Sequence, residues 1–261
     1  MITAEECSRL TTGVSAHTKL DLTNRPIPKT YLSFATDDLN QPNTDRARVN
    51  ALANAKRAIH YQIEIIAAAF GLHKLPAGER NHSPQKLDFC KRCGLIGPRI
   101  VNKLNYVRNQ MEHEYYIPSR DKVENFVDVA ELFLSATNYI LYSFPTEVEF
   151  SNLGESDPPF AYVTINIEPQ QGETLVSGWL VNAEPKEFSE QVAAERQHID
   201  QEFDLMRKEG KEVVLIGDIR DLARQRIVKS LRSDFTKTYR VGSDTEYFDW
   251  VRLCIEKGCS S

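Results

Sequence analysis

Two long runs of apolar residues with helical spacing constrain this chain more than any other feature. In the first run the apolar side chains recur every three or four positions, at Leu52, Ile59, Ile63, Ile66 and Phe70. The second run lies between Ser119 and Pro145 and follows the same pattern. Such spacing places apolar side chains along one side of a helix, and that side must pack against other elements. The sequence therefore predicts two long amphipathic helices.

Two shorter helices are predicted between these runs. Proline in the first turn marks their starts, at Ser83 and at Gly97. The second of them carries an apolar stripe as far as about Tyr116. Four helices with short connections favour a bundle. We therefore expect a mainly α fold with a four-helix bundle over residues 45–144.

The pattern changes after Pro145, where apolar alternation typical of strands begins. The predicted elements are strands over 160–167, 174–181 and 212–216 and helices over 187–208 and 220–232. Residues 145–261 are therefore expected to form a small α/β (α+β) domain. Residues 1–44 contain several prolines and are expected to be an irregular N-terminal extension, with one short possible strand over 31–35.

The net charge of -5 hides an uneven distribution of charge. From Asp45 to Arg120 there are 13 Lys and Arg against 6 Asp and Glu, a balance of +7. From Asp121 to Gly210 there are 5 against 18, a balance of -13. A basic segment inside an acidic chain favours binding to a polyanion. Two ordinary solvated faces of opposite charge remain an equal alternative.

Cysteine usage and hydropathy indicate the compartment. Five cysteines are too few and too irregularly spaced for a disulfide framework, which favours the reducing cytoplasm. Cys90 and Cys93 form a C-x-x-C pair without two further ligands at similar spacing, so we expect no metal. The first residues lack the apolar core of a signal peptide, and no stretch approaches about 18 uninterrupted apolar residues. We expect a soluble cytoplasmic protein without a membrane span.

The end of the predicted third helix gathers polar groups that suit phosphate chemistry. Asn105, Asn109 and His113 fall on nearly one side of a helix, and Arg108 and Tyr115 lie beside them. Guanidinium binds phosphate oxygens in a fork, and imidazole transfers protons near neutral pH. No metal is required for such a site. From these residues alone an ordinary structural role is favoured, with an ion pair between Arg108 and Glu112, His113 near the C-terminal end of the helix dipole and Tyr115 in the core.

The segment from Arg108 to Tyr115 resembles the R-x4-6-H motif of HEPN domains, and it also matches the R-x4-H-x-Y variant of HepT-like toxins. The resemblance covers residues 45–144. It implies a homodimer that forms through the helical bundle and cuts RNA as a metal-independent endoribonuclease without a cofactor. The products would carry 2',3'-cyclic phosphate and 5'-hydroxyl ends.

The resemblance also implies a role for each motif residue. His113 would transfer protons, Arg108 would stabilise the charged transition state, and Asn109 would orient the phosphate or His113. Tyr115 would support the site, together with Asn105 and Glu112. In HepT-like pairs the matching tyrosine is AMPylated by a nucleotidyltransferase antitoxin. A toxin or phage-defence role, with an antitoxin or regulatory protein as partner, is therefore an expectation.

Two alternatives remain open. In the first, the HEPN module is not catalytic and binds nucleotides or RNA, or dimerises, while the C-terminal domain sets the function. In the second, a structural or regulatory protein docks another protein through its acidic middle region. A basic stripe in the last predicted helix either extends an RNA path or is a solvated helix face. Its members are Arg224, Arg226, Lys229 and Arg232.

Overall fold

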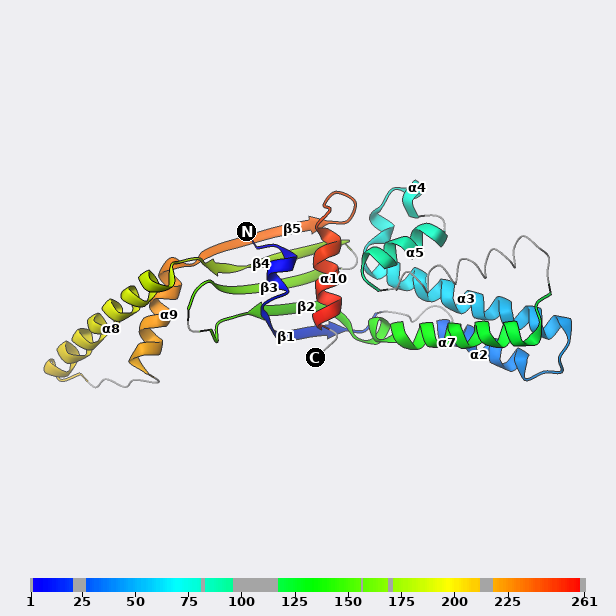
Figure 1. Ribbon diagram of the computed structural model, residues 1–261, viewed down its shortest axis with the longest axis horizontal. Helices are drawn as coiled ribbons and strands as arrows, with labels where there is room; N and C mark the ends of the chain where they lie inside the picture. The colour runs from blue at the N-terminus through cyan, green and yellow to red at the C-terminus, as the bar shows by residue number, and fades with distance from the viewer. Residues whose placement is uncertain are drawn as a thin grey trace. The chain divides into compact units, whose positions relative to one another are not determined.

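The computed structural model describes residues 2–20, 27–80, 83–95, 117–155, 157–168, 171–211 and 218–258. In this part of the chain nine α-helices accompany five strands (Figure 1). The strands form a single antiparallel sheet, so the fold is α+β. None of the described helices is long and apolar enough to pass through a lipid bilayer.

The five strands pair in the order in which they occur along the chain, β1-β2-β3-β4-β5. Their bounds are β1 Thr11–Thr18, β2 Phe144–Ser151, β3 Phe160–Glu168, β4 Glu173–Val181 and β5 Ser233–Arg240. Two of the connections between neighbouring strands are long and helical: the one between β1 and β2 and the one between β4 and β5. The sheet therefore joins the first residues of the chain to its last third.

The prediction of a mainly α fold is wrong, because this sheet makes the fold α+β. The four-helix bundle over 45–144 is not confirmed, since its predicted third helix lies outside the described residues. The predicted N-terminal extension supplies its edge strand β1. Six of the eight residues of β1 are exposed, so this strand carries little apolar alternation. β1 is held in the sheet by its hydrogen bonds to β2 and not by burial of its side chains. Pairing between such distant segments leaves no local pattern in the sequence.

The chain divides into two compact units that are discontinuous in sequence. Unit 1 comprises Met1–Gly13, Glu149–Thr164 and Val176–Lys237, and unit 2 comprises Val14–Val148, Ile165–Leu175 and Thr238–Ser261. The strands contribute residues to both units. The division therefore differs from the boundaries after residues 44 and 144 that the sequence suggests.

Unit 2 contains most of the helices. They are α2 Pro28–Leu39, α3 Asp45–Ala69, α4 Ala77–Arg80, α5 Ser83–Arg92, α7 Arg120–Tyr142 and α10 Tyr247–Gly258, with a 3-10 turn at Leu72–Lys74. The predicted helices that begin near Thr44, Ser83 and Ser119 are confirmed as α3, α5 and α7. The predicted third helix lies outside the described residues. The possible strand over 31–35 is wrong, because α2 spans it.

Local signals explain where α2 and α3 begin. Pro28 occupies the first turn of α2, where its missing N–H costs nothing. The Thr44 hydroxyl accepts a hydrogen bond from the Ala47 N–H at 3.2 Å and caps α3. α2 packs against α3 and α7, and the rings of Tyr31 and Tyr61 meet edge to face with centroids 6.5 Å apart. α2 is therefore part of the helical layer of unit 2.

Helix α10 crosses the strands and completes the core of unit 2 (Figure 1). Trp250 is 1% exposed, and its ring centroid lies 5.8 Å from that of Tyr239 on β5. The Tyr247 hydroxyl donates a hydrogen bond to the Phe70 carbonyl at 2.7 Å. Phe248 packs edge to face on Phe89 of α5. This last helix therefore contacts β5 and α5 through aromatic rings and the residue after α3 through a hydrogen bond.

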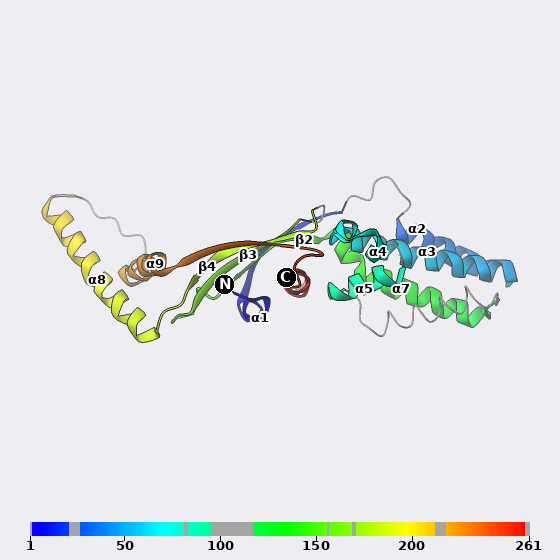
Figure 2. The ribbon, with the colours of Figure 1, turned by 90° about the horizontal axis from the view of Figure 1, so that it is seen from above.

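Unit 1 has a smaller core. Its helices are α1 Ala4–Cys7, α8 Pro185–Lys208 and α9 Ile219–Leu231, and α8 and α9 lie side by side (Figure 2). The predicted strands β3 and β4 and the two predicted helices of this region are confirmed, whereas the predicted strand 212–216 lies outside the described residues. Phe160, Val181 and Phe188 form a buried cluster. Ile227 and Leu231 of α9 pack against this cluster, so α9 is held on one face of the strands.

Candidate functional site

The residues of the HEPN-like motif lie outside the part of the chain that the structure describes. They are Arg108, Asn109, His113, Tyr115, Asn105 and Glu112, all within residues 96–116. The described chain ends at Leu95, after α5, and resumes at Ile117, before α7. The ribonuclease site therefore stays a prediction from the sequence.

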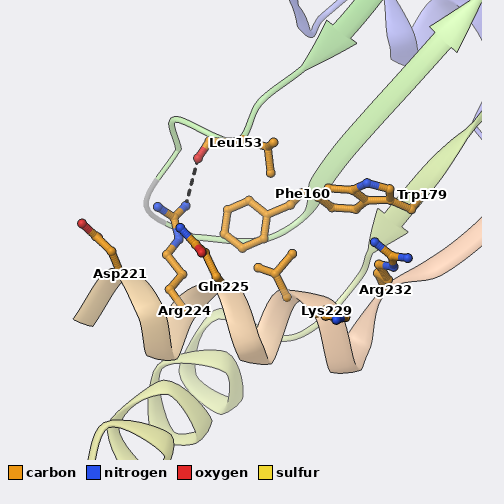
Figure 3. Close-up of a pocket in the computed structure, with 9 residues that line it drawn as sticks. Leu153, Phe160, Trp179, Asp221, Arg224, Gln225, Lys229 and Arg232 are labelled. Carbon is orange, nitrogen blue, oxygen red and sulfur yellow. Dashed lines mark hydrogen bonds between the residues drawn. The ribbon is translucent and has the colours of Figure 1, made fainter. Parts of the chain in front are cut away.

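A cavity of about 560 Å³ opens in unit 1 between α9 and the strands. It brings together β3, β4, α9 and the loop that follows β2 (Figure 3). Its lining residues are Leu153, Phe160, Trp179, Asp221, Arg224, Gln225, Val228, Lys229 and Arg232. Three of these residues are cationic and two are aromatic. The volume falls in the range of pockets that hold small ligands.

The aromatic wall comes from the strands. Phe160 is fully buried, and its ring centroid lies 5.2 Å from that of Phe188 on α8. Trp179 is half-buried and lies beside Tyr162 on the neighbouring strand, with ring centroids 6.3 Å apart and planes inclined by 24°. Phe160 therefore anchors α8, whereas Trp179 keeps part of its indole ring accessible from the cavity.

Arg224 holds one end of the cavity in place. Its Nη2 atom donates hydrogen bonds to the Leu153 carbonyl at 3.3 Å and to the Glu155 carbonyl. The centre of its guanidinium group lies 4.9 Å from the centroid of the Phe160 ring, within the range of a cation–π contact. Figure 3 shows this side chain between the helix and the loop. Arg224 therefore fixes the loop after β2 against α9.

Lys229 and Arg232 are the cations that remain available to a ligand. Both side chains belong to exposed residues at the same end of the cavity (Figure 3). Lys229 has no ion pair within the described parts of the chain. The Arg232 Nε atom lies 3.3 Å from the Asp234 carboxylate, but both partners are largely exposed, so this pair contributes little free energy.

Arg226 belongs to the same helix but points to a different neighbour. Its Nη1 atom lies 3.0 Å from Glu195 and 3.2 Å from Glu202, both on α8. The hydrogen bond to Glu195, followed by the one to Glu202, raises the pKa of Arg226 above its ordinary value. The predicted basic stripe is therefore divided: Arg226 pairs with α8, and the other three cations line the cavity.

This combination of groups fits one class of ligand. Lys and Arg side chains bind phosphate, and an indole ring offers a flat surface on which a base can stack. Gln225 and Asp221 add an amide and a carboxylate, which can recognise the polar edge of a base. The cavity therefore suits a nucleotide better than a purely apolar ligand or an inorganic anion.

The reactive side chains of unit 2 do not form a comparable site. Cys90 and Cys93 are fully buried, and burial raises the pKa of Cys90 to about 12 and that of Cys93 above its ordinary value. Such thiols stay protonated at neutral pH and are poor nucleophiles. Within the described ranges no three His, Cys, Asp or Glu side chains are placed to hold a metal ion.

The sequence pointed to the cations of this site but missed its aromatic wall. Trp179 was visible as a large aromatic residue in a predicted strand, but nothing in the spacing relates it to α9. Only the packing of α9 on β3 and β4 brings the two together. A scan of protein-family models, a search of curated proteins and a search of solved structures each found no match to this chain. Any functional assignment therefore starts from the residues of this chain.

Proposed function

We propose that this protein binds RNA, and that the cavity beside α9 holds one nucleotide of a single strand. The observation that supports this function is the cavity lining, in which Trp179 shares one space with Lys229 and Arg232. The indole ring stacks on the base, and the two cations bind the adjoining phosphate. A single strand is required because the bases of a duplex are stacked on one another.

The division of cations on α9 provides a matched set of variants. Lys229→Gln and Arg232→Gln each remove one charge from the cavity, and Arg226→Gln removes the same charge from the α8 side of the same helix. Trp179→Leu keeps an apolar side chain but removes the stacking surface. The three glutamine variants remove the same charge and differ in whether the lost cation lines the cavity, so they separate specific binding from non-specific attraction.

The test is fluorescence anisotropy of a labelled single-stranded oligoribonucleotide over a range of salt concentrations. Trp179→Leu should weaken binding roughly tenfold, because stacking contributes on the order of 1–3 kcal/mol per base. Lys229→Gln should lower the slope of log affinity against log salt by about 1, as expected for the loss of one phosphate contact. Arg226→Gln should match the wild type. Equal affinity in all four variants would contradict the proposal, and a DNA strand of the same sequence tests the preference for RNA.

A second candidate function is a metal-independent endoribonuclease, and it is favoured by the spacing of Arg108 and His113 in a segment with a balance of +7. In this reaction the ribose 2'-oxygen attacks the adjacent phosphorus and the bond to the 5'-oxygen breaks. His113 transfers the protons, Arg108 stabilises the phosphorane charge and Asn109 orients the phosphate. A homodimer would supply two such motifs to one cleft.

Cleavage of labelled RNA in EDTA tests this second function. Wild-type protein should produce 2',3'-cyclic phosphate ends, and His113→Ala should not. RNA binding should be the same in both proteins, because His113 is not among the residues that line the cavity. Binding without cleavage by either protein, also in the presence of a candidate antitoxin or activator, would favour the non-catalytic alternative, in which the part of the chain after residue 145 sets the function.

A further inference from the structure

The aromatic wall of the cavity continues onto the open face of the strands. Trp179 lines the cavity and also lies beside Tyr162, which is half-buried and does not line it. The two rings stack, with centroids 6.3 Å apart and planes inclined by 24°, so they form an aromatic pair that extends from the cavity across β3 and β4. A ligand that stacks on Trp179 therefore has a second aromatic surface directly beside it.

Burial along the strands of unit 1 distinguishes the two faces of the sheet. Ala161 and Val163 are 5% and 0% exposed, whereas the alternating residues Tyr162 and Thr164 keep part of their surface accessible. Because successive side chains of a strand point to opposite faces, one face is covered and the other is partly open. The open face also carries small polar side chains, Ser177 on β4 and Thr236 on β5. Such residues leave room for a base above the sheet.

Charge changes along the same path. The cations gather at α9, where Lys229 and Arg232 line the cavity. On the open face the partly buried Thr164 and Ser177 are uncharged, and Asp234 on β5 pairs with Arg232. The cavity is therefore suited to a phosphate, and the face beyond it is suited to a neutral base.

We infer that Tyr162 binds a second base, so that the preferred ligand of unit 1 is a single strand of at least two nucleotides. This inference rests on the proposed RNA-binding function and adds the ligand's minimum length and its path. The first base occupies the cavity against Trp179, the linking phosphate lies near Lys229 and Arg232, and the second base stacks on Tyr162. A mononucleotide fills only the cavity, and a duplex cannot present unstacked bases.

Intrinsic fluorescence gives a direct readout, because the chain has two tryptophans and the other one, Trp250, is buried in unit 2. Wild-type protein is titrated with AMP, with the dinucleotide ApA, with a short oligoadenylate and with a duplex of the same length. Quenching of Trp179 reports binding, and Trp179→Leu supplies the background. ApA should bind about tenfold more tightly than AMP, as expected for one additional stacked base.

Variants of Tyr162 test the residue itself. Tyr162→Ser should reduce the affinity for ApA to that for AMP and leave the affinity for AMP unchanged. Tyr162→Phe should keep the gain, because stacking needs the ring and not the hydroxyl. Tyr142→Ser is the matched control, since Tyr142 is a partly exposed tyrosine of unit 2. Circular dichroism establishes that each variant is folded.

The outcomes separate this inference from the function on which it rests. Three results would overturn the inference and leave nucleotide binding in place. The wild-type protein could bind AMP and ApA with equal affinity, Tyr162→Ser could still bind ApA more tightly than AMP, or the duplex could bind as tightly as the single strand. Absence of binding to AMP, ApA and the oligoadenylate would overturn both.

Discussion

Unit 2 buries many of its polar and reactive side chains, whereas unit 1, apart from the buried Cys7, gathers accessible ones around its cavity. In unit 2, Cys90, Cys93 and Gln62 are buried, and the Tyr247 hydroxyl is buried against the Phe70 carbonyl. In unit 1, the cations of α9 and the ring of Trp179 are partly exposed around an open cavity. The first arrangement stabilises a fold, because buried polar groups with partners add order to a core. The second leaves groups available for a ligand.

The sizes of the two cores explain this difference. Unit 2 has the larger buried core, in which Phe70, directly after α3, packs on Phe144 of β2 with ring centroids 5.0 Å apart. Unit 1 holds α8 and α9 on its strands with a small cluster around Phe160. A helix that is held by few contacts leaves part of the strand surface uncovered. The cavity lies where α9 leaves the strands of unit 1 partly uncovered, so the loose packing of this helix creates the space in which a ligand can bind.

The largest expected contrast concerns the thiols of unit 2. Because burial raises the pKa of Cys90 to about 12 from 9.0, its thiolate fraction at pH 8 is about a thousandfold below that of an exposed cysteine. Iodoacetamide at pH 8 should leave Cys90 unmodified in the native protein and label it in urea. Peptide mass spectrometry measures both states. Rapid labelling of the native protein would show that Cys90 is accessible to the reagent and would contradict the claim that unit 2 buries its reactive side chains.

The same thiols predict a pH dependence of stability. The folded state keeps Cys90 protonated up to about pH 12, whereas the unfolded chain releases this proton near pH 9. The stabilisation is therefore fully present below pH 9 and decreases as the pH rises toward 12. Thermal unfolding at a series of pH values should show this loss in the wild type, and Cys90→Ala should reduce it.

A core substitution in unit 2 should cost the most free energy. Trp250→Ala removes a nearly fully buried ring that contacts Tyr239, and the expected loss is about 3–5 kcal/mol of unfolding free energy. Urea denaturation measures it. At urea concentrations below the lowered unfolding midpoint, where Trp250→Ala is still folded, its affinity for RNA should equal that of the wild type. A variant as stable as the wild type would mean that α10 does not complete this core.

A buried hydrogen bond in unit 2 should have an intermediate effect. The Gln62 side-chain amide donates to the Thr137 hydroxyl at 3.1 Å, and this hydroxyl donates to the Phe133 carbonyl at 2.7 Å. Thr137→Val leaves the Gln62 amide without its acceptor and should cost about 1–3 kcal/mol. The double variant with Gln62→Leu should be more stable than the sum of the single changes predicts. Strict additivity would show that the two residues do not interact.

The smallest effect is expected on the α8 side of unit 1. Arg226→Gln removes two ion pairs whose partners are largely or partly exposed, so the unfolding free energy should change by less than about 1 kcal/mol. Arg224→Ala provides the comparison, because it frees the loop after β2 and should reduce RNA affinity as well as stability. A similar loss of RNA affinity in both variants would remove the distinction between the two sides of α9.

The elements that the sequence predicted are those whose pattern is local. α3 and α7 repeat apolar residues over more than six turns, and β3 and β4 alternate on both sides of a short turn. Six of the eight residues of β1 and four of the eight residues of β5 are exposed, and both strands pair with distant segments, so no local pattern marks them. α10 did leave a signal, because Phe248, Val251 and Ile255 recur with helical spacing.

The candidate site shows the same limit. The cations of α9 were recognisable as a basic stripe, but their division into Arg226 on one side and Lys229 on the other depends on where α8 lies. The partnership of α9 with Trp179 arises from tertiary packing alone. The motif around Arg108 and His113, by contrast, was proposed from the sequence and lies outside the described residues.

The most direct test of the central claim is a map of photo-crosslinks between the wild-type protein and a single-stranded oligoribonucleotide, read by peptide mass spectrometry. Crosslinked peptides should come from unit 1 and contain Trp179, Tyr162 or residues of α9, and their yield should fall in Lys229→Gln but not in Arg226→Gln. Crosslinks confined to peptides from unit 2 or from residues 96–116 would contradict the assignment of RNA binding to this cavity.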